Sequence, residues 1–333
     1  MSEPPTIRAH RLSKWYGRVT ALQEVTLDLP PGIWGLLGPN GSGKTTFLKM
    51  AAGLLKPSLG AIRVAGVDPF ANTEAHRRIG LCPEADALYE DLTALQFVSS
   101  MAELSGYAPT EARQRATDAL SAFGLSDAMN RRMGGYSRGM RQRAKLAQAI
   151  VHDPDVLLLD EPLTGTDPVS RTTILNEIRK RADAGGLVIF STHVLHEVEA
   201  LTEQLLLIAD GNLVAQGGVA EIRTLLDEHP HHIQVECDRP RDLAAALVGQ
   251  EGVGGLSFPK AYHLDVYTHR PEDTYRTIAK TLVSNGFKYR RITSPDASLQ
   301  ALFYYLVERG RRRATVAKVP DHPSQTPAAG ATP

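Results

Sequence analysis

The sequence Gly38-Pro39-Asn40-Gly41-Ser42-Gly43-Lys44-Thr45, with the pattern G-x-x-x-x-G-K-[ST], constrains this chain more than any other feature. The apolar run 33–37 before it predicts a buried strand, and residues 46–52 after it predict the start of a helix. Glycines let backbone N–H groups converge on phosphate oxygens, and a helix N-terminus adds partial positive charge. A glycine-rich turn that matches by chance would lack these flanking elements. The segment therefore predicts a binding loop for nucleotide phosphates.

Two side chains of this phosphate loop suit a bound nucleotide and its metal. Lys44 supplies a positive charge between the β- and γ-phosphates, and the Thr45 hydroxyl is a ligand for Mg²⁺. The predicted nucleotide contacts of this segment are Gly38, Pro39, Asn40, Gly41, Ser42, Gly43, Lys44, Thr45 and Thr46.

Length and charge narrow the range of architectures and partners. At 333 residues the chain exceeds the usual size of one hydrophobic core, so we expect two domains. Lys plus Arg and Asp plus Glu both number 37, so the overall positive charge that draws proteins to nucleic acid is absent. The sequence contains neither an apolar run of about 18 residues nor a signal-peptide pattern. We therefore expect a cytoplasmic protein in which Cys82 and Cys237 are unpaired thiols.

Two strands are predicted before the phosphate loop. Residues 7–12 and 22–29 alternate apolar and polar side chains, and Trp15-Tyr16-Gly17 is predicted to form the bend between them. An aromatic ring at this place can stack on an adenine base, and we select Tyr16 over Trp15 for that contact. Packing within the hairpin is the alternative explanation for either ring.

A carboxylate loop and a helical insertion are predicted farther along. Residues 79–82 predict a strand that ends by delivering Glu84 into a loop, because Pro83 forces its predecessor to be extended. From residue 92 to about 130, apolar side chains recur at three- and four-residue spacing, which predicts helices. Another helix is predicted to begin at Ser137, a residue type that caps helix N-termini.

Two aliphatic runs end in polar residues. Residues 156–159 precede Asp160 and Glu161, and residues 187–190 precede a Ser-Thr sequence and His193. Such runs are typical of central parallel strands, whose carboxyl ends point into a site. We therefore predict that Asp160, Glu161 and His193 face the nucleotide. A strand that ends in solvent and a purely structural histidine are the alternatives.

Together, in their order, these motifs resemble the nucleotide-binding subunit of ATP-binding-cassette (ABC) transporters over residues 6–225. Residues 38–45 match the Walker A motif of that family, 156–160 its Walker B motif and 165–167 its D-loop. His193 stands at the position of the switch histidine, and residues 136–140 stand where the L-S-G-G-Q signature belongs. The resemblance implies an α/β P-loop NTPase fold over residues 1–226, with a RecA-like core, an antiparallel β subdomain and a helical subdomain at about 92–152.

The resemblance also implies an ATPase and assigns roles at its site. Lys44 and the loop amides would hold the phosphates of ATP, and Asp160 would hold Mg²⁺ together with the loop threonine. Glu84 would face the metal as well. Glu161 would act as the general base, and His193 would contact the γ-phosphate and keep Glu161 aligned.

Two kinds of partner follow from the same resemblance. In this family the signature segment of one copy covers the nucleotide on the phosphate loop of the other, so Ser137 and Gly139 would come from a second copy or a paralogous cassette. A separate membrane permease would dock near the segment from Glu84 to Gln96. The chain would then lie on the inner face of the plasma membrane and drive export of an unidentified substrate.

Four positions depart from the commonest family pattern. Arg138 and Met140 replace a glycine and the glutamine of the signature, Glu84 replaces a glutamine, and Thr166 replaces an apolar D-loop residue. Residues 83–84 and 136–143 look like the bacterial branch that works with ABC-2-type permeases, which includes drug, antibiotic and sodium exporters.

The C-terminal third predicts a small α+β domain, residues 227–310. Strands at 233–237, 262–268 and 289–292 and helices at 241–249, 271–285 and 298–308 suggest a split βαβ arrangement with an accessory role. The tail 311–333 is rich in Pro, Ala and Thr and is predicted to be disordered.

Two other functions stay open from the sequence. A soluble ABC protein acting on ribosomes or nucleic acid is one, but such relatives carry two cassettes or a long coiled coil, which this sequence lacks. A regulatory subunit that binds ATP without turnover is the other. Glu84 and Thr166 allow it, whereas the presence of Glu161 and His193 disfavours it.

Overall fold

The computed structural model describes residues 4, 6–85, 88–218, 222 and 231–294. A six-stranded sheet has the order β5-β6-β7-β3-β8-β9 and is parallel apart from the β8–β9 hairpin. Its strands are β3 (Gly32–Leu37), β5 (Ile79–Cys82), β6 (Val156–Asp160), β7 (Leu187–Thr192), β8 (Gln204–Ala209) and β9 (Asn212–Gly218). Because β3, β5, β6 and β7 run the same way, their carboxyl ends meet at one edge. This edge carries the phosphate loop and the predicted residues Glu84, Asp160, Glu161 and His193, whereas Tyr16, Ser137 and Gly139 lie on other elements.

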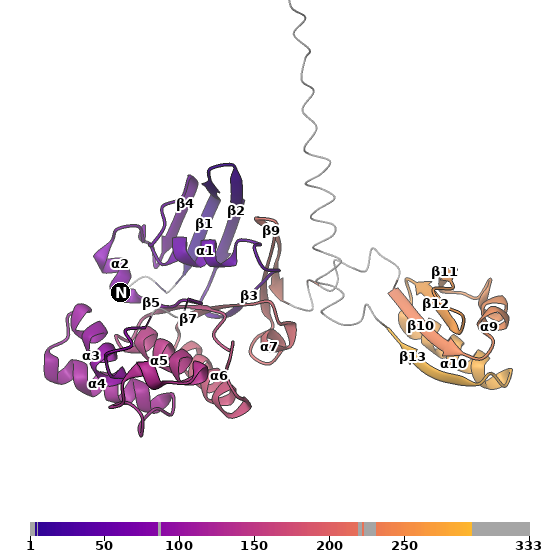
Figure 1. Ribbon diagram of the computed structural model, residues 1–333. Coiled ribbons are helices and arrows are strands. Elements are labelled where there is room, and N and C mark those ends of the chain that lie inside the picture. Colours follow the sequence, from indigo (N-terminus) through magenta and orange to yellow (C-terminus); the bar gives the residue numbers. More distant parts are fainter. Residues whose placement is uncertain (1–3, 5, 86–87, 219–221, 223–230, 295–333) are drawn as a thin grey trace, which may run out of the picture.

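A second, antiparallel sheet lies above this core sheet in Figure 1, with helix α1 (Lys44–Ala51) between them. Its order is β2-β1-β4. The strands are β1 (Ile7–Tyr16), β2 (Val19–Leu29) and β4 (Leu59–Val64). Phe47 and Met50 of α1 are buried in one apolar cluster with Leu12 of β1 and Leu206 of β8. The helix that follows the phosphate loop is therefore fixed from both sides.

The bend predicted between the first two strands is wrong in its position. Trp15 and Tyr16 belong to β1 and pair with Thr20 and Val19, so the strands continue past the aromatic residues. Gly17 makes the turn with a φ of 59°, which glycine adopts without steric cost. The apolar alternation weakens at the exposed tip of the hairpin, although the hydrogen-bonded ladder continues.

Helices cover the opposite face of the core sheet (Figure 1). They are α3 (Ala94–Leu104), α4 (Pro109–Ala122), the 3-10 turn η1 (Met133–Gly135), α5 (Arg138–Ile150) and α6 (Pro168–Asp183). The short helices α2 (Thr73–Arg78) and α7 (Leu195–Glu199) flank β5 and β7. Thr93 and Gln96 form a reciprocal capping box at the start of α3. The predicted helical insertion is present, and Ser137 is the N-cap of α5 as predicted.

The described part of the C-terminal third forms a four-stranded antiparallel sheet of order β11-β12-β10-β13 with two helices. Its elements are β10 (His231–Cys237), α9 (Pro240–Leu247), β11 (Val253–Ser257), β12 (His263–Thr268), α10 (Pro271–Ser284) and β13 (Tyr289–Thr293). This is the split βαβ arrangement. The sequence prediction omitted β11, whose two glycines weaken the strand signal. The predicted helix 298–308 and the tail 311–333 lie outside the described residues.

Candidate functional site

The phosphate loop joins β3 to α1 and exposes the backbone of the first turn of α1. Gly43, the N-cap of α1, has a φ of 112°, and no side chain caps the first N–H groups. A Cβ on Gly43 would lie 2.4 Å from the carbonyl oxygen of Ala21, so glycine is required. The Nζ of Lys44 donates to the carbonyl oxygens of Gly38 at 2.8 Å and Pro39 at 3.3 Å. Uncapped N–H groups at a helix N-terminus and an adjacent ammonium form an anion site.

Asp160 is held by two hydroxyl groups from different elements. Thr45 Oγ1 donates to Asp160 Oδ2 at 2.7 Å, and Ser191 Oγ donates to Asp160 Oδ1. The parallel register of β6 and β7 pairs Asp160 with Ser191, which explains why the two side chains meet. The threonine of the phosphate loop and the aspartate at the end of β6 are therefore adjacent.

Glu161 follows Asp160 in a left-handed backbone conformation with a φ of 51°. Its N–H donates to Ser191 Oγ at 3.0 Å and to the Ser191 carbonyl at 3.2 Å. Its Oε1 lies 3.0 Å from Nδ1 of His193, whereas Thr164 Oγ1 donates to Oε2 at 3.4 Å. A left-handed conformation is costly for a residue with a side chain, so these bonds hold the carboxylate in a strained but defined position.

A cavity of 360 Å³ collects most of the predicted nucleotide and metal contacts. Glu84, Asp160 and Glu161 lie on its wall. The phosphate-loop residues that line it are Asn40, Gly41, Ser42, Gly43, Lys44, Thr45 and Thr46. The Ser42 hydroxyl is buried there without a hydrogen-bond partner, which is consistent with a ligand in the cavity.

Several predicted residues do not line this cavity. Tyr16 is 49% exposed at the end of β1, and its ring lies 5.7 Å from the Lys14 ammonium. Residues 19–21 line the cavity next to the hairpin tip instead. Ser137 and Gly139 are also absent from the lining, and His193 reaches the site through its bond to Glu161.

The charges around Lys44 fit a polyanion that arrives with a divalent cation. Burial lowers the pKa of Lys44, and the carboxylates of Glu161 and Asp160 oppose that shift. One ammonium group faces three carboxylates in this cavity, so a polyphosphate alone would meet net repulsion. Thr45, Asp160 and Glu84 carry oxygen atoms of the kind that Mg²⁺ prefers as ligands. The residues present therefore fit Mg²⁺.

The signature segment at the start of α5 contacts the D-loop of the same chain. The Ser137 hydroxyl accepts a hydrogen bond from the N–H of Met140 at 3.3 Å. A Cβ on Gly139 would meet the carbonyl oxygen of Gly165 at 3.4 Å, and the side chain of Arg138 lies against Gly165. The signature and the D-loop thus form a continuous surface that the cavity does not include.

Three buried polar residues that the sequence reasoning did not select support the site. Ser191 bonds both carboxylate-bearing residues of the β6 end. Gln142 and Lys145, both on α5, donate to backbone carbonyls of the loops after β6 and β5. Ser191 could have been selected because it follows an aliphatic strand, whereas Gln142 and Lys145 carry no local signal.

Comparison with known proteins agrees with this geometry. The family model described as ABC transporter matches residues 22–164. The daunorubicin/doxorubicin resistance ATP-binding protein DrrA of Streptomyces peucetius is 36% identical over 75% of this chain and 77% of its own length. The bacitracin transport ATP-binding protein BcrA of Enterococcus faecalis is 29% identical over 91% of this chain and 97% of its own length.

Solved structures show the same fold. An ATP-binding subunit of an ABC transporter has a TM-score of 0.62 and 27% identity, covering 66% of this chain and 92% of that structure. A dimeric bacterial ABC transporter cassette has a TM-score of 0.60 and 25% identity, covering 64% of this chain and 98% of that structure.

The chain belongs to the ATP-binding proteins of ABC transporters, in a branch whose named relatives include DrrA and BcrA. It is an ATPase with an α/β P-loop NTPase fold.

Proposed function

We propose that the cavity is half of a composite ATP site and that two chains associate head to tail to complete it. The observation that carries this proposal is that the signature residues of a chain lie apart from its own cavity. Ser137 and Gly139 are at the N-terminus of helix α5, and neither of them lines the cavity. An open cavity leaves the γ-phosphate accessible to water from outside. A second copy, or a paralogous cassette, would supply its signature N–H groups and hydroxyl across the interface.

In the composite site, the residues of this chain divide the work of hydrolysis. Lys44 and the loop amides bind the phosphates of ATP, and Glu161 orients the attacking water and accepts its proton. His193 holds Glu161 through the 3.0 Å contact. Thr45, Asp160 and Glu84 would hold Mg²⁺, which neutralises charge on the phosphates when it is bound. The adenine would stack on Tyr16 after a rotation of its exposed ring.

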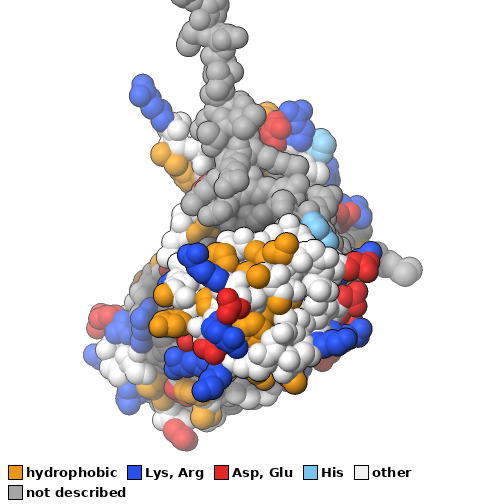
Figure 2. Space-filling model, turned by 90° about the vertical axis from the view of Figure 1, so that its right-hand side faces the viewer, with side chains coloured by type: hydrophobic (Ala, Val, Ile, Leu, Met, Phe, Trp, Pro, Cys, Tyr) orange, Lys and Arg blue, Asp and Glu red, His pale blue; other side chains and the backbone are white. Residues whose placement is uncertain are grey.

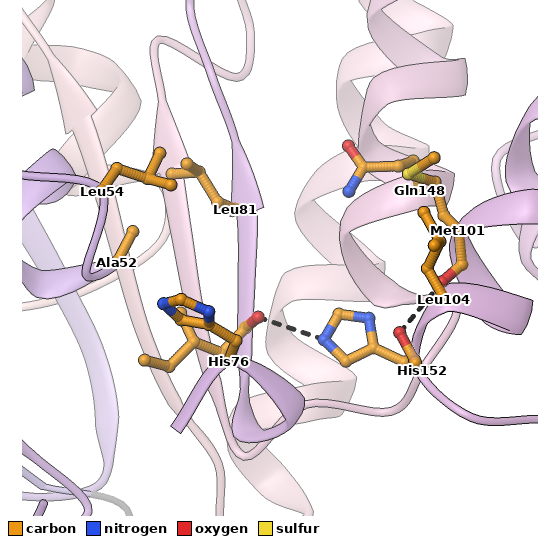
Figure 3. Close-up of a pocket in the computed structure, with 10 residues that line it drawn as sticks. Ala52, Leu54, His76, Leu81, Met101, Leu104, Gln148 and His152 are labelled. Carbon is orange, nitrogen blue, oxygen red and sulfur yellow. Dashed lines mark hydrogen bonds between the residues drawn. The ribbon is translucent and has the colours of Figure 1, made fainter. Parts of the chain in front are cut away.

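A second cavity, separate from the nucleotide site, suits a helix of a membrane permease. A cavity of 240 Å³ lies between β5 and the helical layer, where Leu81 and Met101 border it together with the polar side chains of His76, Gln148 and His152 (Figure 3). Leu54 and Leu104 at its rim are 61% and 80% exposed. None of its lining residues belongs to the predicted docking segment 84–96, which lies between Leu81 and Met101 in the sequence.

We propose that this groove receives an amphipathic helix of an ABC-2-type permease and that ATP hydrolysis drives export through the permease. The relatives named for drug resistance and bacitracin transport support this direction. No helix in the described ranges is long and apolar enough to cross a membrane. The chain would then sit at the inner face of the plasma membrane.

The docking proposal is tested by co-purification with a co-expressed ABC-2-type permease. Leu104→Arg should remove the permease from the affinity-purified complex, because a charge would replace an exposed apolar contact. The matched control is Val283→Arg on α10, which places the same charge at an apolar position that is 76% exposed and does not line the groove. Equal recovery of the permease with both variants would contradict the groove assignment.

Action on nucleic acid or ribosomes receives no support from the charge distribution. Figure 2 shows Lys and Arg side chains interspersed with Asp and Glu on the face that it presents. Ribosome co-purification without a membrane partner would revive that alternative.

The hydrolytic assignment is tested with Glu161→Gln. This variant should bind ATP as the wild type does and lose nearly all turnover, because the amide cannot accept the proton. Asp183→Asn, at the end of α6, removes an acidic group away from the cavity and should leave kcat unchanged. Full activity of Glu161→Gln would exclude Glu161 as the base.

A further inference from the structure

We propose that Lys145 is a positioning residue that fastens the loop bearing Glu84 to the signature helix α5. Lys145 is 4% exposed. Its Nζ donates to three successive carbonyl oxygens, of Pro83 at 3.1 Å, Glu84 at 3.1 Å and Ala85 at 3.3 Å. The inference rests on the proposed role of Glu84 at the metal.

The chemistry of this contact favours a positioning role over simple packing. A buried ammonium needs polar partners because desolvation of the charge is costly, and an apolar side chain would fill the same space without that cost. The carbonyls around Nζ lie just beyond β5, which ends at Cys82, so strand pairing no longer determines their direction. Lys145 therefore fixes the curvature of the segment that places Glu84 in the cavity.

A second contact links the same face of α5 to the other catalytic loop. Gln142 precedes Lys145 by three residues, so both project from one side of the helix. Gln142 Nε2 donates to the Pro162 carbonyl at 3.0 Å, directly after Glu161. Helix α5, which carries Ser137 at its N-terminus, is thus bonded to both loops that carry site carboxylates.

This arrangement has a mechanical consequence. When α5 shifts to bring Ser137 over the nucleotide of the partner copy, the bonds from Lys145 move Glu84 in the same step. Closing the partner's site and adjusting the metal-facing carboxylate of the chain's own site would then be one motion. Loss of Lys145 should separate the two events while leaving the phosphate loop intact.

The test compares Lys145→Met with Arg143→Met in the full-length chain. Arg143 is a control on the same helix: its Nη1 donates to the carbonyls of Phe123 and Gly124, which lie in a loop without catalytic residues. Its Nε donates at 3.4 Å to the carbonyl of Gly139, and does not engage the N–H groups at the N-terminus of α5 that would face the nucleotide. Both variants lose hydrogen bonds from a cationic side chain to backbone carbonyls, so both should lower the concentration of guanidinium chloride at which half of the protein is unfolded. Only Lys145→Met should change the site.

For Lys145→Met we expect kcat to fall about 10- to 100-fold with KM for ATP changed less than about threefold, since misplacement by about 1 Å has effects of this size. The Mg²⁺ concentration for half-maximal activity should rise. Without nucleotide, hydrogen exchange in a peptide covering residues 79–92 should accelerate in this variant and not in Arg143→Met.

A double-mutant cycle with Glu84→Ala decides whether Lys145 acts through Glu84. If it does, Lys145→Met costs less than about twofold in the Glu84→Ala background. An equal loss of kcat in both backgrounds, or an equal loss in Arg143→Met, would overturn the inference. A normal kcat in Glu84→Ala alone would instead refute the proposed role of Glu84.

Lys145→Gln keeps a donor without the charge and covers the case in which Lys145→Met does not fold. It should show an intermediate loss of kcat and an intermediate rise in the Mg²⁺ requirement. Wild-type values for both quantities would overturn the inference.

Discussion

Replacing Ser191 by alanine removes one oxygen atom that holds both carboxylate-bearing residues at the end of β6. The hydroxyl donates to Asp160 Oδ1, accepts from the N–H of Glu161 at 3.0 Å and is fully buried. The Glu161 N–H keeps a second acceptor, the Ser191 carbonyl at 3.2 Å. The bond to Asp160 is therefore the main loss.

The size of the effect follows from these contacts. A hydrogen bond to a charged group contributes about 1.5–3 kcal/mol, so the free energy of unfolding should fall by about 2 kcal/mol. Asp160 keeps its 2.7 Å bond from Thr45. We expect kcat to fall about 10- to 100-fold because a displacement of about 1 Å at reacting groups has that cost. KM for ATP should change less than about threefold, since residues 38–45 keep their contacts.

The assay pairs phosphate release at saturating Mg-ATP with guanidinium denaturation. Thr274→Val is the matched control: it removes the buried 2.7 Å bond between Thr268 and Thr274 in the C-terminal sheet domain. This control should lose stability and keep kcat within about twofold of the wild type. If Ser191→Ala also kept its kcat while losing stability, Ser191 would be a structural residue and the reasoning would fail.

Three further predictions concern the phosphate loop, the two thiols and the half-buried side chain of His152. Gly43→Ala should weaken ATP binding far more than Gly185→Ala, because a Cβ at Gly43 would lie 2.4 Å from the Ala21 carbonyl oxygen, whereas Gly185 also has a positive φ but meets no atom within 4 Å and lies outside the cavity; equal effects in calorimetry would contradict this. Burial raises the pKa of Cys82 to about 12 and also raises the pKa of Cys237, so a disulfide reagent at pH 8 should detect both thiols only after unfolding. Burial lowers the pKa of His152 in the folded protein, so as the pH falls the unfolded chain takes up the proton at a higher pH than the folded chain does. The free energy of unfolding should therefore decrease as the pH falls below about 6.5, the ordinary pKa of histidine. His152→Asn should reduce this decrease, as measured by the urea concentration at half-unfolding across the pH range.

Sequence reasoning succeeded where the signal is local. The phosphate loop, the strand 79–82 and the N-cap at Ser137 are each encoded in a few adjacent residues, and the structure places all three as predicted. The positions of the carboxyl ends of β6 and β7 could be predicted from the aliphatic runs that form these strands. Even Asp160 beside the loop threonine was predictable, because parallel strands share an edge.

The remaining features depend on contacts between distant segments. Ser191 gains its role only through the register that pairs it with Asp160, and Lys145 gains its role only when α5 packs beside the end of β5. Strand β11 was omitted because Gly254 and Gly255 interrupt its apolar alternation. Tyr16 was predicted to lie in a bend because the end of β1 is exposed on both faces, so its sequence lacks the apolar–polar alternation that indicates a strand.

The central claim, that each ATP site is shared by two copies, is tested most directly by mixing two inactive variants. Ser137→Arg should bind ATP and not hydrolyse it, and Glu161→Gln should behave likewise. When they are mixed before ATP is added, a mixed dimer pairs the intact cavity of one with the intact signature of the other. Random pairing should then restore about a quarter of wild-type turnover. A mixture as inactive as its components, or full activity of Ser137→Arg alone, would contradict the shared site.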